Sequence, residues 1–375
     1  MKHKSSPRLR FTGAVLLLAA LIFLVPALRG GDRTLYLLAV VFPCAILLCE
    51  TLLARMFSLD RLILTLCLWL CAAGTAALAV TDPVAAWAQT LRCGAGLAAL
   101  LAGGILIRSL SSSLLTAVCS AFLGLLVLAT RLLAPDFTLP LSEAGLALLL
   151  IAFAALLTRQ GPISAAVAAA AALVLLLLCG ETAEALFWGL TVLLLFFAAD
   201  GRLIVVLPAL AIVLAFFFGA IRLIPVTPAA DQTSLAALVS AGAVGTVTLP
   251  ESLTSLGTGS LFYRLTGHYG LLFSGLTVLL ILPLLLRGTT VASSARTRFH
   301  AVLAMGVCLL LGLRTLAALL SAFGILPLAV QPVPFLTDSL PSLCAQMFLA
   351  GILCGISGRN DADLAEDAHL AMLAK

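Results

Sequence analysis

Runs of about twenty apolar residues recur along this 375-residue chain, and each is long enough to cross a bilayer as a helix. The composition agrees with this pattern, because 63% of the residues are hydrophobic and only 10% are charged. A soluble domain is nearer half apolar and a quarter charged. The chain is therefore predicted to be an all-α polytopic membrane protein, since it has too little polar sequence to cover a very large soluble core.

The pattern predicts about twelve transmembrane helices. They cover 11–29, 35–54, 62–80, 93–108, 113–133, 141–158, 162–180, 183–199, 203–221, 269–286, 299–323 and 340–357. The first run follows a basic stretch, as a signal peptide would. However, it is about eighteen residues long and no small-residue cleavage site stands out after it, so we interpret it as a retained anchor.

The basic residues predict an orientation. With the N-terminus in the cytoplasm, fourteen Lys and Arg residues lie on the inner side and six on the outer side, while Arg314 is left within a span. This bias follows the positive-inside rule and places both termini in the cytoplasm. The net charge of +5 is thus assigned to the membrane topology, and no nucleic-acid partner is expected.

The spans divide the chain into three expected regions. Residues 1–60 hold an N-terminal stretch and two helices, 61–357 form a ten-helix domain, and 358–375 form a cytoplasmic tail. The longest polar loop, 222–268, lies on the outer face in this topology. Loops of that length are usually functional or disordered.

The stretch GILPLAVQPVPFL, residues 324–336, places Pro327, Pro332 and Pro334 just before the last span. Proline has no backbone donor and breaks a helix interior. We therefore predict a non-helical re-entrant segment near the outer face. Irregular backbone at such depth is tolerated only against protein or a water-filled cavity, so a cavity is expected beside it.

Charged residues at membrane depth are functional candidates by default. Arg314 lies about midway along its span, where it either pairs with a carboxylate or with freed carbonyls, or binds a ligand. Further polar residues lie at outer helix ends and outer loops, and they could line an outer cavity. These are Glu143, Glu181, Glu184, Asp338, Arg131, Arg222 and Arg264. Such a cavity would suit a pyrophosphate headgroup, because arginine binds phosphate oxygens bidentately; the alternative is that these residues are interfacial caps and ion pairs.

No metal site or disulfide framework is expected. The ten cysteines mostly lie inside apolar runs, without a CxxC pair or a His cluster. P-loop, HExxH, GxSxG and Rossmann patterns are also missing from the sequence. We therefore expect no cofactor, with a divalent cation left open.

The proline stretch resembles the late signature of the SEDS family, the shape, elongation, division and sporulation membrane proteins that include FtsW, RodA and SpoVE. That signature runs approximately G-L-L-P-x-T-G-x-P-L-P-F. The residues in register with it are Gly324, Leu326, Pro327, Pro332, Pro334 and Phe335, and Ser342 and Leu343 continue the match.

Weaker matches extend the resemblance over about 62–357, which holds ten spans, the number found in the family. LPLSEAGLALLL resembles the P-S-E-x-x-K segment and keeps Glu143. LLLLCGETAEAL resembles Q-P-D-x-G-T, with Glu181 in place of Asp, and GHYGLLFSGLTVLL matches E-E-L-G-L-I-G at Gly270. The segment TDPVAAWAQTLRCGAGLAALL resembles the stretch between the family's first two spans. The first two spans of this chain would be an N-terminal addition.

The resemblance implies a function in bacterial cell-wall synthesis at the cytoplasmic membrane. SEDS proteins polymerise lipid II, an undecaprenyl pyrophosphate-linked precursor, into glycan strands together with a class B penicillin-binding protein. This transfer needs a general base for the attacking hydroxyl and cations for the leaving pyrophosphate. The resemblance thus implies lipid II, a penicillin-binding protein and the bilayer as partners.

The chain departs from the family at the essential acid of the long outer loop, in P-E-x-H-T-D-F. In the two registers that fit, this Asp falls on Ser255 or on Gly259. Neither residue can act as a base in the family manner. Glu251 and Asp338 are the candidate replacements. The family lysine of P-S-E-x-x-K falls on Leu146.

Three functional classes remain open from the sequence. The first is a divergent SEDS glycosyltransferase with a relocated base. The second is a non-catalytic SEDS homologue that binds a polyprenyl-linked precursor or a penicillin-binding protein. The third is an unrelated membrane transporter whose sequence mimics the signature.

Overall fold

The computed structural model describes residues 7–30, 33–133, 141–200, 238–245, 260–323, 325 and 332–373. Over these residues the chain is helical and contains no strand. The helices are α1 (Pro7–Gly30), α2 (Arg33–Leu48), a π-helical turn (Cys49–Leu53), α3 (Ala54–Met56), α4 (Arg61–Ala79), α5 (Pro83–Ser109), α6 (Leu114–Leu133), α7 (Ser142–Arg159), α8 (Pro162–Leu178), α9 (Thr182–Asp200), α13 (Ser260–Leu279), α14 (Ile281–Ser293), α15 (Arg298–Ala322) and α16 (Leu340–Leu373).

The prediction of a polytopic helical membrane protein is confirmed. Eight helices in the described part of the chain are long and apolar enough to cross a membrane, and three further apolar helices are shorter. Eleven of the twelve predicted spans fall on these helices, while the predicted span 203–221 lies outside the described residues. Helix α16 continues to Leu373, so the expected tail, 358–375, is a helical extension of the last span over its described part.

Helix α5 begins ten residues earlier than predicted, and its start has a local cause. The Asp82 carboxylate accepts hydrogen bonds from the amides of Val84 and Ala85, at 2.9 and 3.0 Å. Pro83 occupies the first helical position, where its missing amide hydrogen costs nothing. The polar residues after this cap concealed the helix, because the prediction relied on hydropathy alone.

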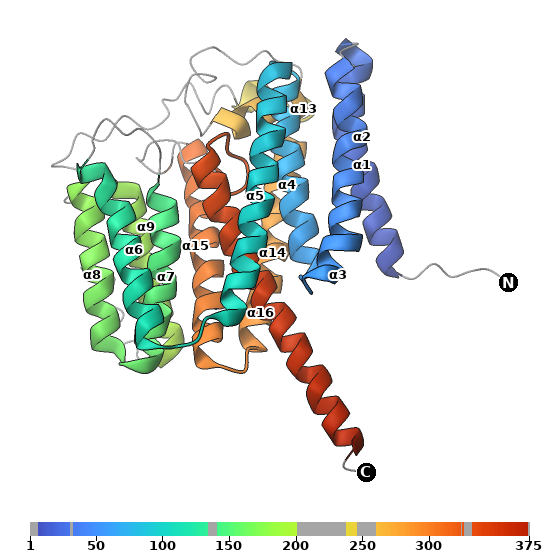
Figure 1. Ribbon diagram of the computed structural model, residues 1–375. Helices are drawn as coiled ribbons and strands as arrows, with labels where there is room; N and C mark the ends of the chain where they lie inside the picture. Colours follow the sequence, from blue (N-terminus) through green and yellow to red (C-terminus); the bar gives the residue numbers. More distant parts are fainter. Residues whose placement is uncertain are drawn as a thin grey trace.

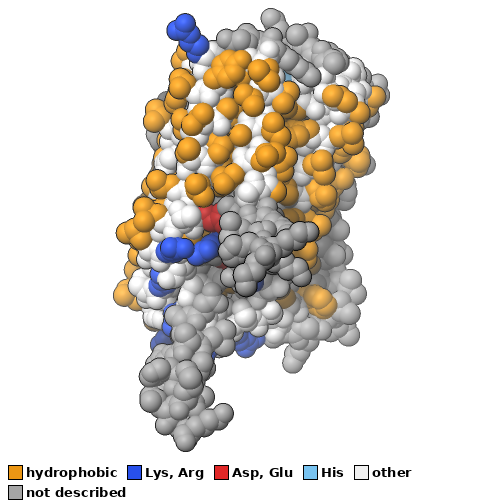
Figure 2. Space-filling view, turned by 90° about the vertical axis from the view of Figure 1, so that its right-hand side faces the viewer, with side chains coloured by type: hydrophobic (Ala, Val, Ile, Leu, Met, Phe, Trp, Pro, Cys, Tyr) orange, Lys and Arg blue, Asp and Glu red, His pale blue; other side chains and the backbone are white. Residues whose placement is uncertain are grey.

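The helices stand roughly side by side, with α6, α7, α8 and α9 at one edge of the bundle and α1 and α2 at the other (Figure 1). Helices α4, α5, α13, α15 and α16 lie between these two groups. Helix α1 begins and α16 ends at the same end of the bundle. The side of α1 and α2 carries a broad band of hydrophobic side chains, and most of the visible Lys and Arg side chains lie below that band (Figure 2). Such a band is what a bilayer-facing surface requires.

Helix α16 crosses the centre of the bundle against α5, and glycines permit this close approach. A Cβ atom on Gly351 would overlap the backbone carbonyl of Leu100, and one on Gly355 would overlap that of Gly104. Gly351 and Gly355 form the GxxxG pattern of the last span. The pattern therefore serves helix packing inside this chain.

Helix α1 is hydrogen-bonded to α13 at a backbone carbonyl that its own helix leaves without a donor. Pro26 lies inside α1 and has no amide hydrogen, so the carbonyl of Ile22, four residues earlier, loses its helical donor. The Tyr269 hydroxyl of α13 donates to that carbonyl at 2.8 Å. The first two helices are thus joined to the bundle by a specific hydrogen bond as well as by apolar packing.

Candidate functional site

The described part of the proline stretch is non-helical and buried, as predicted. Residues 332–339 run irregularly into α16, and Phe335 is fully buried with a left-handed φ of 68°. Leu336 closes a turn by donating its amide to the carbonyl of Val333 at 2.9 Å. Gly324 and Pro327 of the signature lie outside the described residues, whereas Pro332 is half-buried and Pro334 is buried.

Two buried glutamine side chains satisfy the backbone of this segment. The Gln346 carbonyl oxygen accepts the Phe335 amide hydrogen at 2.6 Å. The Gln89 amide donates to the carbonyl of Thr337 at 2.8 Å. Polar backbone groups at membrane depth need such partners, because lipid offers none. Side chains from α5 and α16 therefore hold the re-entrant segment in place.

Arg314 lies at the centre of the site, within α15. It is 5% exposed, and its guanidinium forms ion pairs with Glu143 of α7 and Glu184 of α9. Both carboxylates are 7% exposed. Arg314 is thus paired with carboxylates, which was the first of the two alternatives that the sequence left open. The three side chains form a buried charged centre that joins three helices.

Glu143 receives more donors than Glu184. Besides the Arg314 guanidinium, its carboxylate accepts hydrogen bonds from the Ser342 hydroxyl and, at 2.9 Å, from the Gln346 amide. Both donors come from the first turns of α16. Because Gln346 also holds Phe335, the charged centre and the proline segment form one hydrogen-bonded network.

The network as a whole crosses the bundle near the end where α5, α7, α9 and α16 begin (Figure 1). It starts at Arg92, which donates to Gln89 at 3.2 Å, and continues through Thr337 and the proline segment. The arrangement can hold a fixed positive charge and a fixed backbone shape, and it is rigid because nearly every member has a partner.

Asp338 lies two residues before α16, between Thr337, which Gln89 binds, and Ser342, which donates to Glu143. Its Oδ1 atom is buried and has no hydrogen-bond partner among the described residues, and the neighbouring Ser339 hydroxyl is in the same state. A buried carboxylate oxygen without a donor is costly and is a marker of function. Asp338, one of the two candidate bases named from the sequence, thus lies beside the network with one carboxylate oxygen unsatisfied in the described structure.

The other predicted site residues lie on α13, just before α9, or outside the described part of the chain. Arg264 lies on α13, where it donates to Thr81 at 3.5 Å. Glu181 immediately precedes α9, one turn before Glu184. Arg222, Glu251, Ser255 and Gly259 lie outside the described residues.

Sequence reasoning missed Gln89 and Gln346 and gave little weight to Glu184. Each of them lies within the first turns of its helix, beside other polar residues. Gln346 follows Ser342 by four residues, which puts both on one face of α16. That spacing, together with the cost of an amide in hydrocarbon, is the signal that could have identified them.

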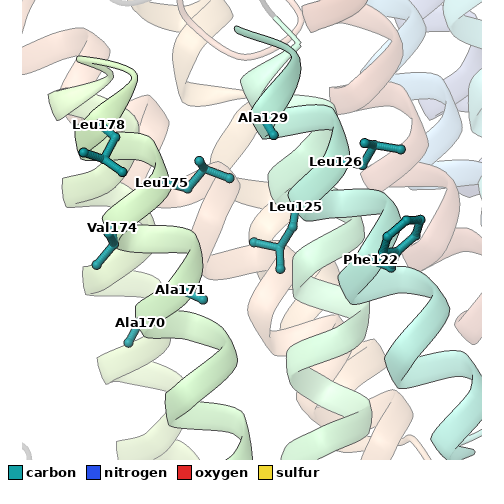
Figure 3. Close-up of a pocket in the computed structure, with 9 residues that line it drawn as sticks. All are labelled: Phe122, Leu125, Leu126, Ala129, Ala170, Ala171, Val174, Leu175 and Leu178. Carbon is teal, nitrogen blue, oxygen red and sulfur yellow. The ribbon is translucent and has the colours of Figure 1, made fainter. Parts of the chain in front are cut away.

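A separate apolar groove of about 600 Å³ lies between α6 and α8. It is lined entirely by apolar side chains of the two helices, and Leu125 of α6 and Leu175 of α8 project into the space between them (Figure 3). The groove contains none of the predicted site residues and belongs to the apolar surface of the bundle. Within the described parts of the chain, no three His, Cys, Asp or Glu side chains form a group that could hold a metal ion.

Comparison with known proteins gives one short sequence match. No family model matches the chain. A segment of 87 residues is 37% identical to the probable peptidoglycan glycosyltransferase FtsW of Geobacter sulfurreducens. The match covers 23% of this chain and 23% of that protein, so the chain aligns with about a quarter of the length of this curated relative.

Solved structures are similar over most of the chain. The rod shape determining protein RodA of Thermus thermophilus superimposes with a TM-score of 0.60 and 20% identity, over 80% of this chain and 97% of that chain. A chain of a peptidoglycan synthase complex that coordinates polymerization and crosslinking gives a TM-score of 0.63 and 21% identity, over 81% of this chain and 98% of that chain.

The fold and the site thus define a polytopic helical membrane protein with a re-entrant proline segment bound to a buried charged centre. This fold is that of RodA and of the peptidoglycan synthase chain, and it confirms the resemblance that the sequence predicted.

Proposed function

We propose that this chain is a divergent SEDS protein of bacterial cell-wall synthesis that acts on a polyprenyl pyrophosphate-linked glycan precursor such as lipid II. The observation that carries the proposal is the match of its fold to 98% of a peptidoglycan synthase chain. The proline segment and Glu143, which the sequence shares with the family, support it, because they form one hydrogen-bonded network.

In this proposal the chain is a glycosyltransferase whose base has moved. A base removes the proton from the hydroxyl of the incoming sugar, and that oxygen attacks the sugar carbon bound to the pyrophosphate, which leaves with its electron pair. Asp338 supports this role, because its buried Oδ1 atom has no partner in the described structure. Glu251 is the second candidate base, from the loop.

The leaving pyrophosphate needs cations at the same end of the bundle. Arg264 and Arg222 are the candidates, on α13 and in the loop before it. Arg314 has both terminal nitrogens occupied by carboxylates, so we assign it the positioning of Glu143 and of the proline segment. Arg314 and Glu143 together shape the site, and Glu181 adds a carboxylate just before α9.

A non-catalytic homologue is the second candidate function. It is favoured by the loop sequence, where the family Asp falls on Ser255 or Gly259, and by the engagement of Arg314 with two carboxylates. Such a protein would bind the lipid-linked precursor or a class B penicillin-binding protein. In either case we place it in the bacterial cytoplasmic membrane with both termini in the cytoplasm.

The test is glycan polymerisation from lipid II in proteoliposomes, with and without a class B penicillin-binding protein and beside a known polymerase. We expect polymer from the wild type and its loss in Asp338→Asn or Glu251→Gln. Asp82→Asn is the matched control, since asparagine also caps a helix and Asp82 lies at the same end of the bundle.

Polymer formation untouched by both substitutions would refute the base assignment. No polymer, together with saturable lipid II binding that weakens in Arg264→Ala, would identify the non-catalytic homologue. Substrate flux into sealed vesicles without either result would instead indicate a transporter.

A further inference from the structure

Helix α13 is interrupted at Gly270, whose φ and ψ angles are 85° and 166°. In an unbroken helix the amides of Leu271 and Leu272 would donate to carbonyls four residues earlier. The interruption takes these two amides out of the helical ladder. Backbone donors that leave the ladder need other acceptors.

The acceptors come from a short segment of the long polar loop, residues 238–245. The Leu271 amide donates to the carbonyl of Gly242 at 3.0 Å, and the Leu272 amide donates to that of Ala243 at 3.4 Å. Leu238 in the same segment is buried at 1% exposure. The segment 238–245 is thus hydrogen-bonded to the backbone at the break of α13.

Glycine is required on both sides of this contact. A Cβ atom on Gly270 would overlap the carbonyl oxygen of Ala243, and one on Gly245 would overlap the backbone nitrogen of Gly270. Gly242 and Gly245 also adopt left-handed φ angles of 65° and 71°, which side chains with a Cβ rarely adopt. We call these two hydrogen bonds and the facing glycines 242, 245 and 270 the loop joint.

We propose that the loop joint is a positioning element that fixes the segment 238–245 of the polar loop on α13. The described segment ends at Gly245, which contacts α13 beside Gly270, and the chain enters α13 at Ser260. Ten residues of helix separate these two points, a distance of about 15 Å. The fourteen residues between them include Glu251 and both positions at which the family acid would fall. The joint itself follows from the hydrogen bonds, whereas its catalytic consequence rests on the proposed function.

The experiment is hydrogen–deuterium exchange of the full-length protein in lipid nanodiscs, followed by mass spectrometry of the peptides that contain 238–245 and 271–272. The wild type is expected to protect both peptides. Gly270→Ala should accelerate their exchange about tenfold, because local opening then costs less. Gly275→Ala is the matched control, since it lies on the same helix with open space around its Cβ position, and it should exchange like the wild type.

Unprotected amides at Leu271 and Leu272 in the wild type would overturn the joint, and so would unchanged exchange in Gly270→Ala. If that variant does not fold, Gly245→Ala and the wild-type protection decide the question. Polymerisation from lipid II is measured in parallel. Faster exchange in Gly270→Ala together with full polymerisation would refute the positioning role. A wild type that never polymerises would refute the proposed function, and the exchange test of the joint would still stand.

Discussion

Arg314 of α15 and Glu143 of α7 form an ion pair inside the bundle, and Glu143 is also bonded to two side chains of α16. Glu184 shares the same guanidinium, and among the described residues Arg314 is the donor to its carboxylate. The charged centre thus combines one guanidinium with two carboxylates that accept different numbers of hydrogen bonds. This asymmetry predicts unequal effects of neutralising them.

Glu143→Gln should lower the free energy of unfolding by about 2–3 kcal/mol, because Arg314 keeps Glu184 but Ser342 and Gln346 lose their charged acceptor. Glu184→Gln should cost about 1 kcal/mol, since Arg314 then keeps Glu143 and the centre becomes electrically neutral. Thermal and denaturant unfolding in one detergent would compare the two variants. Equal losses would mean that the carboxylates contribute equally, against the difference in their donors.

Gln346 links the proline segment to the charged centre, so its loss should loosen both. Gln346→Leu leaves the Phe335 amide hydrogen without its acceptor and should destabilise the protein by about 2 kcal/mol or more. Gln160→Leu is a suitable control, because Gln160 is exposed at the end of α7. Comparable unfolding midpoints for the two variants would contradict the conclusion that Gln346 stabilises the proline segment.

The contact between α5 and α16 should not tolerate a methyl group. Gly351→Ala places its Cβ against the Leu100 carbonyl and should destabilise the protein by about 1–3 kcal/mol through overpacking. Gly94→Ala on α5 meets open space and should be neutral or stabilising by up to about 1 kcal/mol. Melting temperatures of the two purified variants provide the comparison, and a stable Gly351→Ala protein would argue against the close approach.

The hydrogen bond between Tyr269 and the Ile22 carbonyl can be tested by a double-mutant cycle. Tyr269→Phe should cost about 1–2 kcal/mol, because it leaves the carbonyl opened by Pro26 without a donor. In a Pro26→Ala background the alanine amide restores the helical bond, so the same tyrosine change should cost less than half as much. Independent, additive effects would show that Pro26 and Tyr269 are not coupled.

The sequence predicted the helices well because each buries apolar residues over the full width of a bilayer. It also predicted the irregular backbone at Pro332 and Pro334, since proline acts locally. The pairing of Arg314 could not be read in the same way, because both of its partners come from distant helices. Gln346 was missed for the same reason, since one amide in an apolar span does not reveal what it faces.

The opening that Pro26 makes in α1 has a consequence for the synthesis of the protein. Tyr269 follows Ile22 by 247 residues, so at about 5–20 residues per second the carbonyl waits roughly 10–50 s for its donor. During that time a bare polar group would face hydrocarbon, which is costly. We expect the nascent hairpin of α1 and α2 to stay beside the insertion machinery, or beside a water defect, until α13 arrives.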